Sequence, residues 1–175
     1  LGKYMNEIFI PTREGYLPEF KDLSLREKVS LCYGYGLQTT LVQLISAYST
    51  IFSEGSYRPL KLIKNSSKFE EERILNKEDA ENIKSILYQS IKNGTGFRAK
   101  VKHHDVFGKT GTARIFKNEK YNDDLHNALF IGMTKLENKE YLIGLFVKNP
   151  RLNGDGGGDV AAPIFSEIIE TIQKF

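Results

Sequence analysis

An extended run at residues 107–114, Phe-Gly-Lys-Thr-Gly-Thr-Ala-Arg, constrains the fold more than any other stretch of the chain. It is typical of a β-strand in which a glycine lets a ligand lie against the backbone. In a strand, the side chains of Lys109 and Gly111 face one way and that of Thr110 faces the other. Thr110 would need an irregular edge, or a rotamer that reaches over the rim, to meet a ligand held by Lys109. Such an edge suits an extended peptide that carries an anionic group.

The dipeptide Gly108-Lys109, followed by a threonine, also suggests a phosphate-binding P-loop. That motif requires a glycine five residues before Gly108, and His103 stands there. A P-loop also opens a helix, whereas residues 111–116 continue an extended run. Both observations argue against a phosphate site. Lys-Thr-Gly by itself is a weak signal of a ligand-binding strand, because the tripeptide often occurs by chance.

Composition limits the remaining classes of protein. The 175 residues suit one domain, and a formal charge of +3 without a Lys/Arg block gives no reason to expect nucleic acid. Cys32 is the one cysteine, and the three histidines lack a ligand spacing with it, so we expect no metal and no cofactor. No apolar run approaches the length of a membrane span, and no signal peptide is visible. Because the chain does not begin with Met, we expect it to be a piece of a longer protein.

Periodicity predicts two helices ahead of the central strand and one at the end of the chain. The first covers residues 38–53, the second runs from Lys77 to about Asn93 behind an Asn76 N-cap, and the last opens at Pro163. The second should bury Ala80, Ile83, Ile86, Leu87 and Ile91, and the last carries a stripe of Ile164, Phe165, Ile168, Ile169 and Ile172.

Strands are predicted at residues 126–135 and 141–148, which with the central strand make an antiparallel meander. Their core candidates are Leu129, Ile131, Met133 and Leu145. A short strand is expected at residues 57–64 and surface loop at 65–73, with a polar turn at 117–124. Loop-like structure is expected at residues 1–30, and the glycine-rich segment at 149–159 is expected to be a flexible loop, with a binding segment as the alternative. The prediction is an α+β fold, an antiparallel sheet packed against helices.

Several blocks in a fixed order now point to one family. The chain resembles the C-terminal part of the transpeptidase domain of a class B penicillin-binding protein, most closely the division-specific member. Residues 34–172 carry most of the resemblance, and residues 1–3 add a weaker match. The blocks are Tyr-Gly-Tyr-Gly-Leu-Gln-Thr-Thr at 33–40, Gln-Leu at 43–44, Ala-Tyr-Ser-Thr at 47–50, Tyr-Arg-Pro-Leu at 57–60, Gly-Lys-Thr-Gly-Thr-Ala at 108–113 and Gly-Gly-Asp-Val-Ala-Ala-Pro-Ile-Phe at 157–165.

The family uses two further motifs that this chain lacks. Ser-x-x-Lys supplies the nucleophile and a lysine base one turn away, and Ser-x-Asn completes the site. No serine in the sequence has Lys three places later or Asn two places later. In the family both motifs precede Lys-Thr-Gly. We therefore expect residues 1–175 to be the C-terminal part of the domain, without the nucleophile and inactive alone.

The resemblance assigns roles to four residues. Lys109 would add positive charge and a hydrogen bond towards the Ser-x-Asn serine. Thr110 and Thr112, with Gly111 between them, would bind the carboxylate of a D-Ala-D-Ala stem peptide or of a β-lactam. The Thr112 backbone N–H would be an oxyanion-hole donor. Asp155-Gly156 depart from the family, whose division enzymes tend to have aromatic residues before the paired glycines, so ligand preference is open.

The resemblance also implies membrane proteins of division or elongation as partners, and a place on the periplasmic side of the bacterial inner membrane. Two alternatives stay open. One is a catalytically silent β-lactam sensor or interaction module, and the other is a serine β-lactamase fragment, which shares Lys-Thr-Gly. The block at residues 157–165 favours the transpeptidase. The sequence upstream of Leu1 would separate all three.

Overall fold

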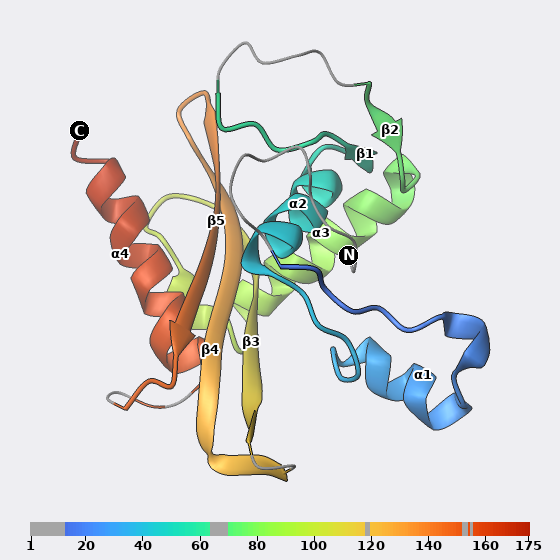
Figure 1. The fold of residues 1–175 in the computed structure, drawn as a ribbon. Coiled ribbons are helices and arrows are strands. Elements are labelled where there is room, and N and C mark those ends of the chain that lie inside the picture. Colours follow the sequence, from blue (N-terminus) through green and yellow to red (C-terminus); the bar gives the residue numbers. More distant parts are fainter. Residues whose placement is uncertain (1–12, 64–69, 118–119, 152–153, 155) are drawn as a thin grey trace.

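A computed structural model describes residues 13–63, 70–117, 120–151, 154 and 156–175. A three-stranded sheet forms the middle layer, with α4 on one face and α2 and α3 on the other (Figure 1). The elements are η1 (Phe20–Asp22), α1 (Leu25–Cys32), α2 (Leu41–Phe52), β1 (Ser56–Tyr57), β2 (Glu72–Arg73), α3 (Lys77–Lys92), η2 (Phe97–Ala99), β3 (Val106–Lys117), β4 (Lys120–Leu136), β5 (Lys139–Lys148), η3 (Gly157–Ala161) and α4 (Ala162–Ile172). The predicted α+β class is confirmed.

The sheet is the predicted antiparallel meander, in the order β3-β4-β5. Lys109 pairs with Ile131, and the register shifts once, between Arg114 and Ile115. The polar turn predicted at residues 117–124 is wrong, because the ladder continues to Lys117 and Lys120. Polar composition misled the prediction, since backbone hydrogen bonds can extend a hairpin without an apolar face. Residues 118–119, between the strands, lie outside the described residues.

The face of the sheet towards α4 holds the best-buried side chains. The Phe130 and Phe165 rings meet with centroids 5.1 Å apart, and both residues are fully buried, as is Ile169. Gly132 is needed beneath them, because a Cβ there would lie 2.5 Å from Phe130 and 3.0 Å from Phe165. The predicted stripe of the last helix is thus confirmed at Phe165 and Ile169, and its other three members are half-buried. It anchors α4 to β4.

The helices on the other face begin with side-chain caps: α3 starts at Lys77 as predicted, whereas α2 starts at Leu41, inside the predicted range of 38–53. Thr40 and Asn76 cap α2 and α3 by accepting hydrogen bonds from the Gln43 and Asp79 backbone N–H groups. In α3, Ala80, Leu87 and Ile91 are buried as predicted and Ile83 is half-buried, but Ile86 is 67% exposed. Burial of Ile86 was therefore a wrong prediction. The described sheet covers only part of the helix circumference.

Two further predictions fail in the first half of the chain. Residues 13–30 are not all loop, since a Ser24–Glu27 capping box starts α1. This helix buries no apolar stripe that periodicity could have revealed, and its Leu25 and Val29 remain exposed. The strand predicted at residues 57–64 is only the two-residue β1, paired with β2, and Pro59 has no N–H to extend the ladder. Of the expected loop at 65–73, residues 65–69 lie outside the described part, as do 1–12 of the first segment.

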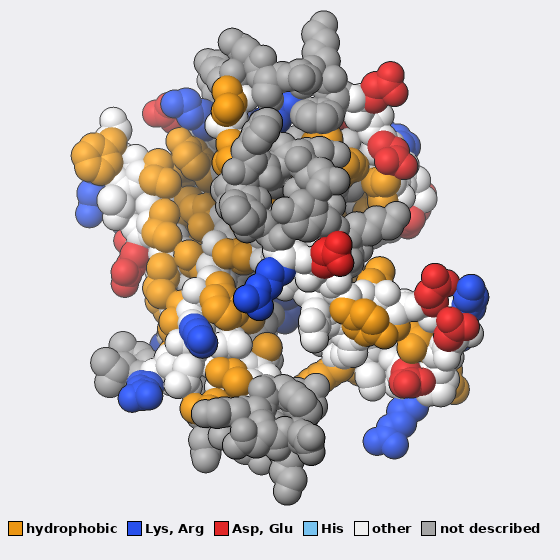
Figure 2. Space-filling view, viewed as in Figure 1, with side chains coloured by type: hydrophobic (Ala, Val, Ile, Leu, Met, Phe, Trp, Pro, Cys, Tyr) orange, Lys and Arg blue, Asp and Glu red, His pale blue; other side chains and the backbone are white. Residues whose placement is uncertain are grey.

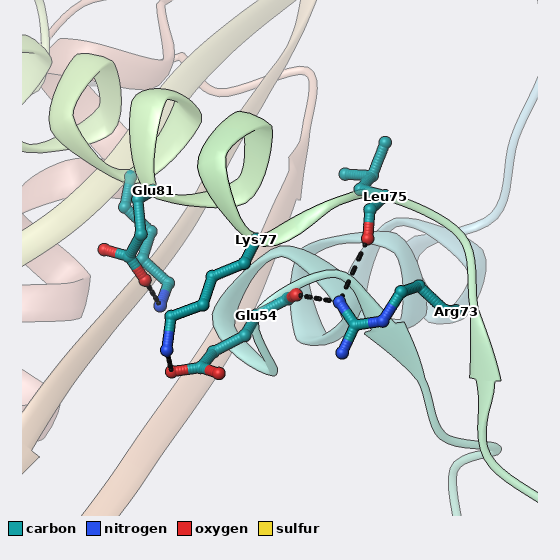
Figure 3. A network of polar contacts seen from close by, with 6 residues as sticks. Glu54, Arg73, Leu75, Lys77 and Glu81 are labelled. Carbon is teal, nitrogen blue, oxygen red and sulfur yellow. Dashed lines mark hydrogen bonds and ion pairs between the residues drawn. The ribbon is translucent and has the colours of Figure 1, made fainter.

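A polar junction joins α2, the β1–β2 pair and the start of α3 (Figure 3). Arg73 donates to the Glu54 and Leu75 backbone carbonyls at 2.9 and 3.3 Å, and Lys77 pairs with the Glu54 carboxylate at 3.0 Å. The hydrogen bond from Lys77 holds the Glu54 pKa below its usual value. Gly55 turns the chain with φ +89°, and a Cβ there would lie 2.2 Å from the Leu75 carbonyl oxygen. The turn accepts only glycine.

We therefore expect Gly55→Ala to lower the free energy of unfolding by about 1 kcal/mol or more, since it combines positive φ with a backbone clash. Lys77→Ala is the matched control in the same junction, and it should change stability little because the pair is exposed. Urea unfolding of both variants measures the difference. Equal effects would mean that the ion pair, not the turn, holds the junction.

Hydrophobic side chains also reach the surface. Figure 2 shows them gathered over β5 and the adjoining side of α4, and again on the α1 region. The large exposed ones among the described residues include Tyr16, Leu17, Phe20, Leu25, Val29, Tyr33, Tyr35, Ile86 and Phe146. In α2, the apolar side chains at helical spacing, Leu41, Leu44, Ile45, Tyr48 and Phe52, are only partly buried, whereas Gln43, Ser46 and Thr50 are buried. Exposed apolar patches of this kind mark surfaces that other protein covers.

We expect residues 1–175, produced alone, to be marginally stable or prone to aggregate, and to be rescued by co-expression with the upstream half of the domain. Sedimentation velocity and a thermal melt, each with and without that half, make the test. A monomer that melts cooperatively above about 60 °C would instead identify an autonomous domain.

Candidate functional site

The candidate site lies on β3, an edge strand among the described residues. Phe107 faces α2 and α3, because its ring lies 6.2 Å from Phe52 and 5.5 Å from Tyr88. Strand alternation then places Lys109 and Gly111 on that face. Lys109 is exposed, so its ammonium group is available at the border between the sheet and the helices.

The Thr110 hydroxyl reaches over the rim of the strand towards Lys109. Its side chain starts from the opposite face, yet its hydroxyl lies 3.5 Å from Lys109 Nζ, which also donates to the Thr110 carbonyl at 3.0 Å. The rim of an edge strand allows this, because no further described strand covers it. A cation and a hydroxyl therefore stand together at the edge of β3.

A second hydroxyl joins them from outside the strand. Thr95 Oγ1 lies 2.6 Å from Thr110 Oγ1, and Thr95 belongs to the turn that follows α3. The sequence predicted only that the helix ends at about Asn93, and it gave Thr95 no role. A hydroxyl between two glycines was the available signal. Nothing in the local pattern indicated that the turn reaches β3.

The glycine-rich segment lies against the face of β3 that carries Thr110 and Thr112, opposite the face towards α2 and α3. The Gly157 N–H donates to Thr112 Oγ1 at 3.1 Å, and a Cβ on Gly157 would lie 2.2 Å from the Leu129 carbonyl oxygen and 2.5 Å from that of Gly111. Gly157 is buried and begins η3. The loop predicted at residues 149–159 is therefore wrong for 157–159, where backbone packing on the strands sets the conformation. Asp155, with residues 152–153, lies outside the described residues.

The two glycine turns also touch each other. A Cβ on Gly158 would lie 2.6 Å from the Thr95 carbonyl oxygen, and Arg98 pairs with Asp159 at 3.7 Å. Thr110, whose Cγ2 is 3.9 Å from the same Cβ position, stands between them. The strand that carries the four predicted residues, Lys109 to Thr112, is thus held by two segments, at Thr95 and Gly157, that lie 62 positions apart in sequence.

Other chemistry finds little support in the part of the chain that the structure describes. No group of three His, Cys, Asp or Glu side chains there could hold a metal ion. None of the described helices has the length and apolar character needed to cross a bilayer. A cavity of about 390 Å³, lined by His104, Tyr141, Ile172 and Phe175 among others, shares no residue with the β3 site.

Comparisons with known proteins identify the family of the chain. The penicillin binding protein transpeptidase domain matches residues 1–170. The chain is 34% identical, over 99% of its length, to the peptidoglycan D,D-transpeptidase FtsI of a Buchnera aphidicola strain, and 30% identical over 97% to the probable peptidoglycan D,D-transpeptidase PenA of Neisseria flavescens. It spans 31% and 42% of the lengths of those relatives.

Solved structures show the same fold. The transpeptidase domain of penicillin-binding protein 3 from Burkholderia pseudomallei superposes with a TM-score of 0.87 at 28% identity, over 99% of this chain and 54% of that one. Penicillin-binding protein 3 of Mycobacterium tuberculosis, complexed with aztreonam, gives 0.86 at 26% identity, over 99% and 43%. The resemblance stated from the sequence is confirmed: the chain belongs to the transpeptidase-domain family of penicillin-binding proteins.

Proposed function

We propose that this chain forms the substrate-binding wall of a peptidoglycan D,D-transpeptidase that acts in bacterial cell-wall synthesis and division. The observation that carries the proposal is the edge of β3, where the Lys109 ammonium and Thr110 hydroxyl lie within 3.5 Å of each other. An edge strand also offers backbone groups to an extended peptide. The ligand is a stem peptide that ends in D-Ala-D-Ala, or a β-lactam.

The chemistry of the ligand fits this edge. Both ligand classes carry a carboxylate, which Lys109 attracts by charge and which the Thr110 and Thr112 hydroxyls bind as donors. Thr112 accepts from Gly157 N–H, and its own hydroxyl hydrogen is still free to be donated. Gly111 lets the ligand backbone approach the strand. These four residues orient the ligand but do not supply a nucleophile.

Acyl transfer needs a serine, which in this proposal comes from an upstream Ser-x-x-Lys motif. The serine attacks the ligand carbonyl and its proton passes to the lysine base, which gives it to the nitrogen as the C–N bond breaks, leaving an acyl-enzyme. D-Ala departs from a stem peptide, whereas the opened ring of a β-lactam stays attached. Negative charge develops on the carbonyl oxygen. The Thr112 backbone N–H is one donor to that oxyanion, a role worth about 2.7–4 kcal/mol in comparable hydrolases.

Several properties of relatives support this assignment. Relatives that match nearly the whole chain are named peptidoglycan D,D-transpeptidases. Penicillin-binding protein 3 of Mycobacterium tuberculosis, a solved relative, has structures in complex with aztreonam and with ampicillin. The chain spans 54% of a solved transpeptidase domain, which supports its assignment as a part of such a domain. By the same resemblance, the protein faces the periplasm from the inner membrane and works with membrane proteins of division or elongation.

The two alternatives differ in what they predict. A silent sensor or interaction module would bind β-lactams without turnover of a peptide, and a β-lactamase would hydrolyse them rapidly. The names of the relatives favour the transpeptidase over both. Ser-x-x-Lys and Ser-x-Asn upstream of Leu1, after a membrane anchor, would support the transpeptidase directly.

Lys109→Ala in the full-length protein should slow acylation by fluorescent penicillin on the order of 100-fold, because it removes the charge at the carboxylate site. Its melting temperature should stay within about 2 °C, since Lys109 is exposed. Lys139→Ala, an exposed lysine at the start of β5, is the matched control and should react like the wild type. A large loss of stability with acylation intact would make Lys109 a structural residue.

Residues 1–175 alone should form no covalent adduct with penicillin, because the sequence holds no serine with the partners that would activate it. Intact-mass spectrometry of the chain after incubation detects an adduct, with the full-length protein as positive control. A stable acyl group on any serine of this chain would show that the nucleophile lies here and that our placement of it is wrong.

A further inference from the structure

Thr95 lies outside the four residues of the β3 site, yet it makes a short contact with one of them. Its Oγ1 is 2.6 Å from Thr110 Oγ1, and either hydroxyl can be the donor. Thr110 Oγ1 in turn lies 3.5 Å from Lys109 Nζ. The three polar groups form a chain that runs from the turn after α3 to the exposed ammonium group.

The backbone around Thr95 is held on two sides. The Gly96 N–H donates to the Ser90 carbonyl at 3.1 Å, which ties the turn to the last turn of α3. On the other side, Gly158 packs so closely that a Cβ there would lie 2.6 Å from the Thr95 carbonyl oxygen. The Arg98–Asp159 ion pair, at 3.7 Å, joins the same two segments. The backbone that carries the Thr95 side chain is therefore held by packing on both sides.

The available hydrogens set the directions of the hydrogen bonds among Lys109, Thr110 and Thr95. The Lys109 ammonium only donates, so towards Lys109 the Thr110 oxygen acts as acceptor. Thr110 has one hydrogen to give. With the site empty, that hydrogen can go to Thr95. When an anionic ligand takes it, Thr95 can reverse and donate its own hydrogen to Thr110.

We propose that Thr95 is a positioning residue: it holds the Thr110 hydroxyl in the rotamer that donates to the carboxylate of the ligand. This inference rests on the proposed role of Thr110 in binding that carboxylate. A hydroxyl that both accepts and donates is polarised by its neighbours, which strengthens the bond to the anion. Thr95 is exposed, so water competes for it in the empty site, and its effect grows when the ligand displaces that water.

The test uses Thr95→Val, which removes the hydroxyl at nearly the same volume, and Thr95→Ser, which keeps it. The control is Thr171→Val, since Thr171 is also exposed and its hydroxyl donates only within α4, to Glu167. In the full-length protein, stopped-flow acylation by benzylpenicillin separates the dissociation constant of the first complex from the acylation rate constant. We expect Thr95→Val to raise the dissociation constant about fivefold to tenfold, the range of one hydrogen bond. Thr95→Ser should restore it to within about twofold of the wild type.

A second measurement does not depend on the reaction. Three-bond couplings to the Thr110 methyl carbon report its χ1 rotamer in methyl-labelled protein. We expect one rotamer in the wild type and in Thr95→Ser, and averaging over rotamers in Thr95→Val. An unchanged rotamer in Thr95→Val overturns the inference, as does a dissociation constant equal to that of Thr171→Val.

The two proposals fail separately. If wild-type protein does not react with penicillin but the Thr110 rotamer depends on the Thr95 hydroxyl, positioning stands and the proposed function falls. If the wild type reacts and neither the rotamer nor the dissociation constant responds to Thr95→Val, the function stands and the inference falls. If Thr95→Ser is as impaired as Thr95→Val and both melt early, Thr95 has a structural role only and the inference is wrong.

Discussion

The pairing of β3 with β4 is the interaction on which the rest of the structure depends. It holds Lys109 opposite Ile131 and fixes which side chains of β3 face each layer. A shift of one residue would turn Phe107 away from Phe52 and Tyr88, and would turn Lys109 towards α4. Two glycines make this register possible, because Gly108 and Gly132 leave room for the Phe130 ring beneath the sheet.

The same pairing creates the site by leaving one edge of β3 uncovered. Lys109 and Thr110 meet over that rim, although they start from opposite faces of the strand. The glycine-rich segment then packs on the strand at Gly157 and on the Thr95 turn at Gly158, by contacts that only glycine allows. The result is a polar edge with a rigid backbone, and a rigid backbone reduces the entropy lost when an extended ligand binds.

Apolar side chains are left exposed on the outer surfaces, in contrast to the buried centre of the fold. Side chains such as Ile86, Tyr33 and Phe146 are exposed at positions where a packed domain would cover them. Relatives that match nearly the whole chain are two to three times longer, and the solved transpeptidase domain matched here is almost twice as long. Both observations agree with a chain that packs against further protein of the same domain.

The sequence by itself determined the elements whose signals are local: the cap at Asn76, the apolar stripe of α4, the meander, and the extended run around Lys109. The ordered blocks also identified the family. Only the tertiary structure decided the contacts between distant segments, such as Thr95 with Thr110 and Gly157 with Thr112. It also decided the exposure of Ile86 and the extension of β3 and β4 through a polar stretch. The reason is physical, since periodicity records which face of an element is apolar, whereas a turn that packs on a strand leaves no periodic trace.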